Sequence, residues 1–207
     1  MNLSKKAHLA DLRSDIAQAA ASGNAERQKT LRALLSCWNR KESFLPFAPL
    51  LEDGTDRDVQ YFVADAFAYA KDEQVLVPLM QAAVAPVNHN YSSTLIWPCG
   101  KYDCTKHLAF FVDFMLRCAD PGEAMWACVD VIEAMRGPFE PTYLKHTVHR
   151  LLTEENPATE ADMRVQHEVF RVQAASALLD RYYVQVHKQW DEIETPAAGS
   201  ETPAPVG

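Results

Sequence analysis

A 32-residue offset relates three parts of the chain, and it constrains the fold more than any other feature. Leu-Pro-Phe-Ala at residues 45–48 is followed by Val-Pro-Leu-Met at 77–80 and by Ala-Phe-Phe-Val at 109–112. The apolar segments at 59–64, 91–96 and 123–128 keep the same offset. Each unit reads as an apolar helix, a polar turn and a second apolar helix. A repeat of this length is typical of a solenoid.

The repeat therefore predicts an all-α chain, a right-handed α-solenoid of antiparallel helix pairs in one domain over residues 1–194. Residues 1–41 are expected to form an N-terminal helical hairpin cap, residues 42–138 three repeats of about 32 residues, and residues 139–194 the C-terminal capping helices. Residues 195–207 are rich in Pro, Ala, Gly, Ser and Glu, a composition that predicts a disordered tail.

Apolar spacing and turn residues give the expected helices. Pro98 lies within one of them, where it must cost a backbone hydrogen bond or produce a kink. Thr55 and Asp58 resemble a capping box, and Asp120 is the expected cap before Pro121. The predicted helices cover residues 5–22, 25–40, 44–51, 59–70, 75–83, 91–99, 108–116, 123–135, 141–154 and about 159–193.

Composition excludes several classes of protein. No stretch approaches the roughly 20 apolar residues of a membrane span. The first residues are mixed and polar, without the apolar core of a secretory signal, so a cytoplasmic protein without a membrane partner is expected. Five cysteines are an odd number, and mostly buried, unpaired thiols are the expected state.

Charge is unevenly distributed along the chain. Residues 1–41 carry eight Lys/Arg against three Asp/Glu, a balance of +5, whereas residues 42–140 carry six against fifteen, a balance of −9. An acidic repeat region repels a phosphate backbone and attracts a basic protein. Nucleic acid is therefore not the expected partner. The alternative is that the acidic surface has no binding role and only keeps the protein soluble.

The pattern resembles the HEAT-repeat family of armadillo-like α-solenoids. The resemblance is carried by residues 44–53 with 59–70 and by residues 108–120 with 121–135, where a Leu-rich helix, an Asp/Pro turn and an Ala-rich helix follow one another. Residues 88–99 fit the family pattern poorly. Residues 91–133, with Tyr102-Asp103-Cys104 at a junction, look like small bacterial HEAT-repeat proteins encoded beside secreted toxins as candidate immunity proteins.

In such solenoids the second helix of each pair lines the concave face, which is where this resemblance places a binding site. If Val59, Phe62, Val63 and Ala66 pack inward, the residues between them point away from the core. Aromatic residues with charged neighbours suit a protein interface, because Trp and Tyr dominate binding energy. The 32-residue offset gives three sets: Tyr61, Asp65 and Tyr69; Ser93, Trp97 and Lys101; Met125, Val129 and Glu133. The predicted protein-binding residues are Tyr61, Asp65, Tyr69, Trp97, Lys101 and Glu133.

Metal, cofactor and catalytic sites have weaker support. His146 and His149 share a helix face but lack a third ligand, and Cys99, Cys104 and His107 match no standard zinc spacing. No Gly-rich phosphate loop is present in the sequence, and no Cys-His pair is marked out for catalysis. We therefore expect no metal, no cofactor and no enzymatic activity.

Three functions remain open. The resemblance implies an immunity-type protein that neutralises a basic toxin domain, and a scaffold or chaperone for another protein would use the same surface. The enzyme alternative is a HEAT-like alkylpurine DNA glycosylase, whose concave-face residues would here be Trp97, Trp126, Asp65 and Asp130. Such an enzyme needs a positive groove for DNA, and the repeat region is acidic. The sequence leaves the oligomeric state open.

Overall fold

The computed structural model describes residues 3–70, 72–118, 121–158 and 160–194. These residues are helical, with turns and no strand between them, which confirms the all-α prediction for the part described. The α-helices are α1 (Leu3–Ala19), α2 (Ala25–Arg40), α3 (Leu50–Asp53), α4 (Arg57–Phe67), α5 (Leu76–Val84), α6 (Ser92–Ile96), α7 (Leu108–Arg117), α8 (Glu123–Ala134), α9 (Pro141–Thr153) and α10 (Ala161–Glu194). Five 3₁₀ segments join them: η1 (Leu45–Phe47), η2 (Glu73–Val75), η3 (Pro86–Tyr91), η4 (Trp97–Lys101) and η5 (Thr105–His107).

The observed helices differ from the predicted ones chiefly where prolines fall. The continuous helix expected over 44–51 is a 3₁₀ segment followed by the short α3, because Pro46 and Pro49 have no N–H to donate. The helix expected over 91–99 stays α-helical only to Ile96 and continues as η4, with Pro98 near its start. The predicted kink is thus a change of helix type.

One predicted cap is wrong. Asp56, and not Thr55, is the N-cap of α4, and its carboxylate accepts a hydrogen bond from the Val59 N–H at 3.1 Å. Asp56 lies three residues before Val59, the spacing an N-cap requires. The cap predicted at Asp120, the predicted start of the last helix at about 159, and the predicted tail at 195–207 fall outside the described residues.

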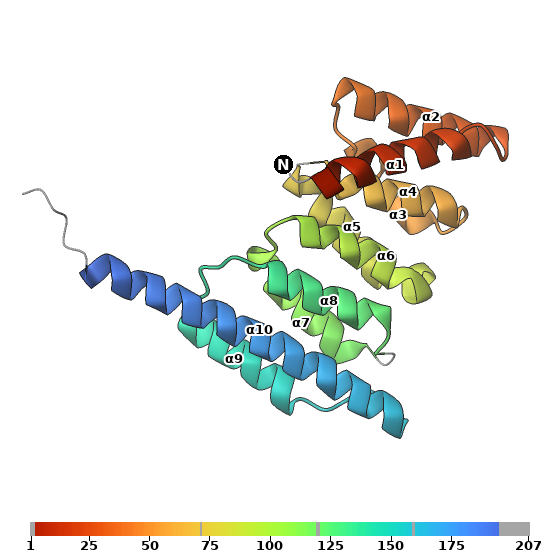
Figure 1. Ribbon diagram of the computed structural model, residues 1–207. Helices are drawn as coiled ribbons and strands as arrows, with labels where there is room; N and C mark the ends of the chain where they lie inside the picture. The colour runs from red at the N-terminus through yellow and green to blue at the C-terminus, as the bar shows by residue number, and fades with distance from the viewer. Residues whose placement is uncertain (1–2, 71, 119–120, 159, 195–207) are drawn as a thin grey trace, which may run out of the picture.

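The helices follow one another from one end of the molecule, at α1 and α2, to the other, at α9 and α10 (Figure 1). Helices α4, α6, α8 and α10 contact one another in that order, while α3 contacts α5 and α7 contacts α9. Within pairs, α1 packs on α2, α3 on α4, α5 on α6, α7 on α8 and α9 on α10. None of the described helices is both long enough and apolar enough to cross a bilayer.

One hydrophobic core runs through these contacts. Leu31 and Leu34 of α2, Phe67 of α4 and Phe111 of α7 are fully buried in it. Helix–helix packing of such side chains supplies most of the stability of short helices, which are marginal alone. The short α3 and α6 therefore depend on their neighbours.

A buried polar network joins the first two repeats. The Asn88 side chain in η3 is fully buried and donates hydrogen bonds to the carbonyls of Leu51 and Ala82 at 2.7 and 2.9 Å. Its Oδ1 accepts from Arg57 at 2.6 Å and from Gln60 at 2.8 Å. The amide is satisfied on both sides, so it fixes α4 relative to η3 and the end of α5.

A second polar cluster attaches α10 to its neighbours. The buried Arg171 side chain donates to the carbonyls of Leu151, Arg150 and Glu154 at the end of α9. The Arg150 carbonyl also accepts from the Glu154 N–H at 3.0 Å. The guanidinium adds donors for the carbonyls at this helix end, so it caps α9. His167, one turn earlier on α10, is buried with Nε2 3.0 Å from the Met115 carbonyl of α7.

Candidate functional site

Exposed aromatic side chains gather along α4, η4 and α8, on the side of the molecule where α4, α6, α8 and α10 contact in turn. Tyr61 is 50% exposed, Trp97 37% and Trp126 53%. We call this surface the aromatic face. It comprises two clefts of about 300 Å³ and 620 Å³.

The first cleft, of about 300 Å³, lies between α4 and the α6–η4 segment and is lined by Tyr61, Asp65, Ala68, Tyr69, Ser93, Thr94, Trp97, Pro98, Lys101 and Glu123. The second, of about 620 Å³, lies between α8 and α10 and is lined by Trp126, Val129, Asp130, Glu133, Val172, Gln173, Ser176, Ala177, Asp180 and Arg181.

Two tryptophans join the clefts. Trp97 lines the first cleft and Trp126 the second, and their rings meet edge to face with centroids 5.6 Å apart and planes at 75°. This is a favourable arrangement for two aromatic rings. The pair forms a ridge between the clefts, so a partner that contacts the ridge reaches both.

Five of the six predicted binding residues come together in the first cleft: Tyr61, Asp65, Tyr69, Trp97 and Lys101. The sixth, Glu133, is exposed and lines the second cleft. The six residues thus share one face but not one cleft.

The 32-residue offset fails for two positions in the third repeat. Met125 and Val129 were expected to point away from the core, but both are buried. Trp126 and Asp130, one residue further on, are the more exposed side chains at the second cleft, although Val129 also lines it. A helix turns about 100° per residue, so a shift of one residue moves a side chain from the surface to the core. The repeats are not in strict register.

A signal for Trp126 and Asp130 was present in the sequence. Trp126, Asp130 and the predicted Glu133 are spaced by four and three residues, so they share one face of a helix. Two of them are charged, which favours the exposed side of an amphipathic helix. The period of α8 itself, without the offset, therefore places Trp126 and Asp130 on the same side as Glu133.

The aromatic face carries more acid than base. Asp65, Glu123, Asp130, Glu133 and Asp180 line the two clefts, against two cations. The cations are Lys101, at the first cleft, and Arg181, which donates to the Glu133 carbonyl at 2.6 Å. Five carboxylates against two cations give a formal balance of −3, so the face attracts a basic partner.

The titration of its side chains follows from burial and from this charge. Burial raises the pKa of Tyr61 and of Tyr69, and the nearby Asp65 carboxylate raises both further. Burial also raises the pKa of Asp130, although a hydrogen bond from Trp126 opposes the shift. The tyrosines therefore remain neutral hydrogen-bond donors at neutral pH.

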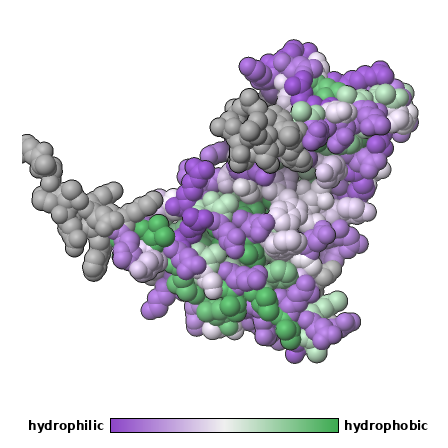
Figure 2. All heavy atoms as spheres, viewed as in Figure 1, coloured by the Kyte–Doolittle hydropathy of each residue, from purple (hydrophilic) through white to green (hydrophobic). Residues whose placement is uncertain are grey.

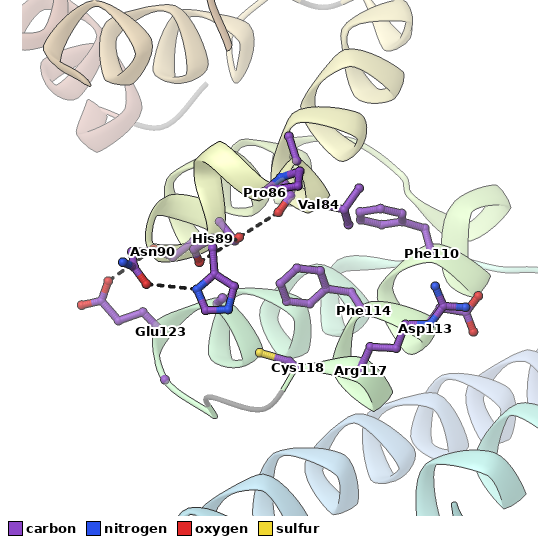
Figure 3. A pocket seen from close by; sticks show the side chains of 16 residues that line it. Val84, Pro86, His89, Asn90, Phe110, Asp113, Phe114, Arg117, Cys118 and Glu123 are labelled. Atoms are coloured by element: carbon purple, nitrogen blue, oxygen red, sulfur yellow. Dashed lines mark hydrogen bonds between the residues drawn. The ribbon is translucent and has the colours of Figure 1, made fainter. Parts of the chain in front are cut away.

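A separate cavity of about 730 Å³ lies between α5, η3, α7 and the start of α8 (Figure 3). Phe110 and Phe114 of α7 and Val84 of α5 give it an apolar wall, and His89 and Arg117 project toward it from opposite sides. Asp113 at its edge is paired with Arg150 of α9 at 2.8 Å. The cavity holds none of the six predicted binding residues.

The candidate metal ligands do not assemble. Within the described ranges, no group of three or more His, Cys, Asp or Glu side chains is placed to hold a metal ion. Cys104 donates to the Cys99 carbonyl at 3.3 Å, and burial raises the pKa of Cys104 to about 12. These thiols are neutral and held by backbone carbonyls. All five cysteines lie in the described part of the chain, and none forms a disulfide.

Comparison of the chain with family models, with curated proteins and with solved structures found no match.

Proposed function

We propose that the chain is an α-solenoid that binds a basic protein through the aromatic face and has no enzymatic activity of its own. The observation that carries the proposal is the Trp97–Trp126 ridge. Two large apolar rings are exposed side by side between clefts lined by carboxylates. Exposed tryptophans in such a setting are the residue type that most often anchors a protein interface.

The solenoid reading is supported by the order of helix contacts. Helices α4, α6, α8 and α10 contact in sequence, as the second helices of successive pairs do in a solenoid. Residues from all four helices or their 3₁₀ extensions line the aromatic face. An extended face built from repeated helices is the surface that solenoids present to partners.

The chemistry of the face indicates what the partner presents. Its acidic balance of −3 favours Lys and Arg side chains, and the ridge favours an apolar or guanidinium group packed on the indoles. A segment with basic residues on both sides of an apolar or Arg anchor fits both features. The anchor would contact the ridge while the basic residues enter the two clefts.

We further propose that binding neutralises the partner, as in the immunity-type proteins that the sequence resembles, and that the partner is a toxin domain. A scaffold or chaperone for another protein would use the same face. The two functions differ in whether the bound partner loses its activity. The face does not suit DNA, because five carboxylates repel a phosphate backbone.

The test is affinity capture from extract of the source cell with three forms of the protein. The wild type is compared with a Trp97→Ala/Trp126→Ala double variant and with Tyr143→Ala. Tyr143 is 42% exposed on α9 and lines neither cleft, so it is a matched loss of an exposed aromatic ring.

We expect one basic protein to be recovered in equal amount by the wild type and Tyr143→Ala, and to be lost from the double variant. Recovery that is equal for all three forms, or recovery of nucleic acid alone, would contradict the proposal. If the captured protein has an activity, that activity is measured in the complex. Loss of activity indicates an immunity-type protein, and retained activity indicates a scaffold or chaperone.

A further inference from the structure

Helix α10 has a second apolar stripe that stays about half exposed in the described part of the chain. Val165, Val169, Val172, Leu179 and Tyr183 are each between 48% and 65% exposed. Figure 2 shows hydrophobic atoms following the band in which Figure 1 draws α10. Isolated exposed apolar residues are ordinary, but a continuous row of them marks an interface.

The spacing of the row is that of a coiled-coil seam. From Val165 the steps are four, three, four, three and four residues through Val169, Val172, Ser176, Leu179 and Tyr183. Apolar residues at alternating steps of three and four, the heptad pattern, form the narrow contact line of two paired helices. Ser176 is the one polar residue in the row.

The seam lies roughly opposite the buried side of α10, and its residues Val172 and Ser176 also line the α8–α10 cleft. The side that contacts α8 and α9 carries the buried His167, Arg171, Ala174, Ala175 and Leu178. At about 100° per residue, Leu178 lies roughly 120–160° around the helix from the seam residues Val172, Ser176 and Tyr183. One helix therefore has two apolar sides, and one of them stays about half exposed in the described part of the chain.

The position of the helix makes this exposure unusual. The last helix pair of a stack meets water, and terminal units normally have a polar outer surface for that reason. Helix α10 lies at the end of the molecule opposite α1 and α2 (Figure 1). Its 34 residues span about 51 Å, which is long enough for a stable helix pair.

A second copy of α10 complements the seam when it runs antiparallel. In one register Val172 faces Tyr183 of the second copy, and Ser176 faces Leu179, so each small side chain meets a larger one. The same register places Gln173 opposite Asp180, which brings no like charges together beside the seam. A parallel pair would set Tyr183 against Tyr183 and leave Ser176 against Ser176.

We propose that two copies of this chain form a dimer with two-fold symmetry through an antiparallel pairing of their α10 helices along the seam Val165, Val169, Val172, Ser176, Leu179 and Tyr183. The contact is isologous, so it closes at two copies. Since Val172 and Ser176 also line the α8–α10 cleft, the second copy borders that cleft. The inference goes beyond the proposed function and does not depend on it.

The mass of the purified full-length protein in solution tests the dimer. The chain has a mass of 23.2 kDa, so sedimentation or light scattering is expected to give twice that value for the wild type. A Val172→Glu/Leu179→Glu variant is expected to give the single-chain mass with unchanged helicity, since both side chains are about half exposed. Charge in the seam opposes pairing because two copies bring like charges together.

The matched control is Val77→Glu/Val84→Glu. Both valines are exposed on α5, at 46% and 58%, so the control adds the same charge away from the seam and is expected to stay dimeric. A wild type with the single-chain mass would overturn the proposal and leave the seam to a helix of another protein. A seam variant that kept the double mass would overturn it as well.

Disulfide cross-linking tests the orientation. Ser176→Cys and Leu179→Cys are made separately in a chain whose partly exposed cysteines, Cys37 and Cys118, are replaced by Ser. The antiparallel register predicts that a mixture of the two variants cross-links more completely than either variant alone. Efficient cross-linking of Ser176→Cys with itself would contradict that register.

Discussion

Replacing Asn88 by Ala tests how the first two repeats are held together. The substitution removes four hydrogen bonds, two donated to the carbonyls of Leu51 and Ala82 and two accepted from Arg57 and Gln60. Each partner retains another hydrogen bond: Gln60 still donates to Leu51, Arg57 still donates to Gln60, and Ala82 still accepts from Ala85. No partner is therefore left wholly unsatisfied.

The expected loss follows from that count. At about 0.5–1.5 kcal/mol for each net hydrogen bond, with some recovery by rearrangement, we expect the free energy of unfolding to fall by about 3 kcal/mol. For a chain of 207 residues this lowers Tm by roughly 6–12 °C. Denaturant and thermal unfolding followed by circular dichroism measure the change.

The neighbouring Asn90 provides the control. It is exposed, and its Oδ1 lies 3.1 Å from the Nδ1 of the adjacent, exposed His89, so Asn90→Ala is expected to change stability by less than about 0.5 kcal/mol. A free energy of unfolding for Asn88→Ala within about 1 kcal/mol of the wild-type value would refute the reasoning, since four buried hydrogen bonds would then contribute almost nothing. Equal losses for both variants would refute it too.

Three further predictions concern buried groups. Arg171→Met removes the donor to the Leu151 and Glu154 carbonyls at the end of α9 and is expected to destabilise the protein by about 2–4 kcal/mol in urea unfolding, with Arg32→Met at an exposed site of α2 as control. Burial, with a smaller effect of Arg171, lowers the pKa of His167, whereas Glu168 opposes the shift. The unfolded chain then binds the proton more tightly, so stability is full above about pH 6.5 and falls as the pH drops below it. His167→Gln is expected to flatten this part of the profile, and an unchanged slope would contradict the assignment. A thiol reagent is expected to label Cys37 and Cys118 in the native protein and all five cysteines after unfolding.

Local sequence patterns predicted the helices well because most helix ends are determined by nearby residues. The predicted α2 matches the observed bounds, and α10 was expected to within about two residues at either end. The errors occur at Pro46, Pro49 and Pro98. The sequence shows that a proline disrupts an α-helix, but the choice between a kink and a 3₁₀ segment depends on packing against other helices.

The candidate site was predicted only where local helix periodicity determines which side chains are exposed. Tyr61, Asp65 and Tyr69 follow from the period of a single helix, and in the structure all three line one cleft. The sequence points to Trp126 and Asp130 only under the DNA glycosylase alternative. They are absent from the predicted protein-binding set because a fixed offset assumes equal repeats, and the 3₁₀ segment η4 makes the second repeat unequal. The Trp97–Trp126 contact joins residues on different helices, so no local pattern reveals it.

For the α10 seam, the local spacing is visible in the sequence, but its exposure depends on packing. Its spacing is readable in the sequence, yet α10 has apolar residues all around it, and the pattern alone does not say which row faces the core. The packing of Leu178 and Ala174 against the rest of the chain decides this. Only then is the row through Val172 and Leu179 left uncovered.

The affinity of the captured partner for the Trp126→Ala protein is the most direct test of the aromatic face. Trp126 is about half exposed, so the variant is expected to fold, while loss of an interface anchor weakens binding by 2 kcal/mol or more, which is about 30-fold in Kd. Titration calorimetry with the purified partner, using Tyr143→Ala for comparison, measures it. The account predicts about a 30-fold or greater loss for Trp126→Ala and wild-type affinity for Tyr143→Ala. Wild-type affinity for both would show that the partner binds elsewhere.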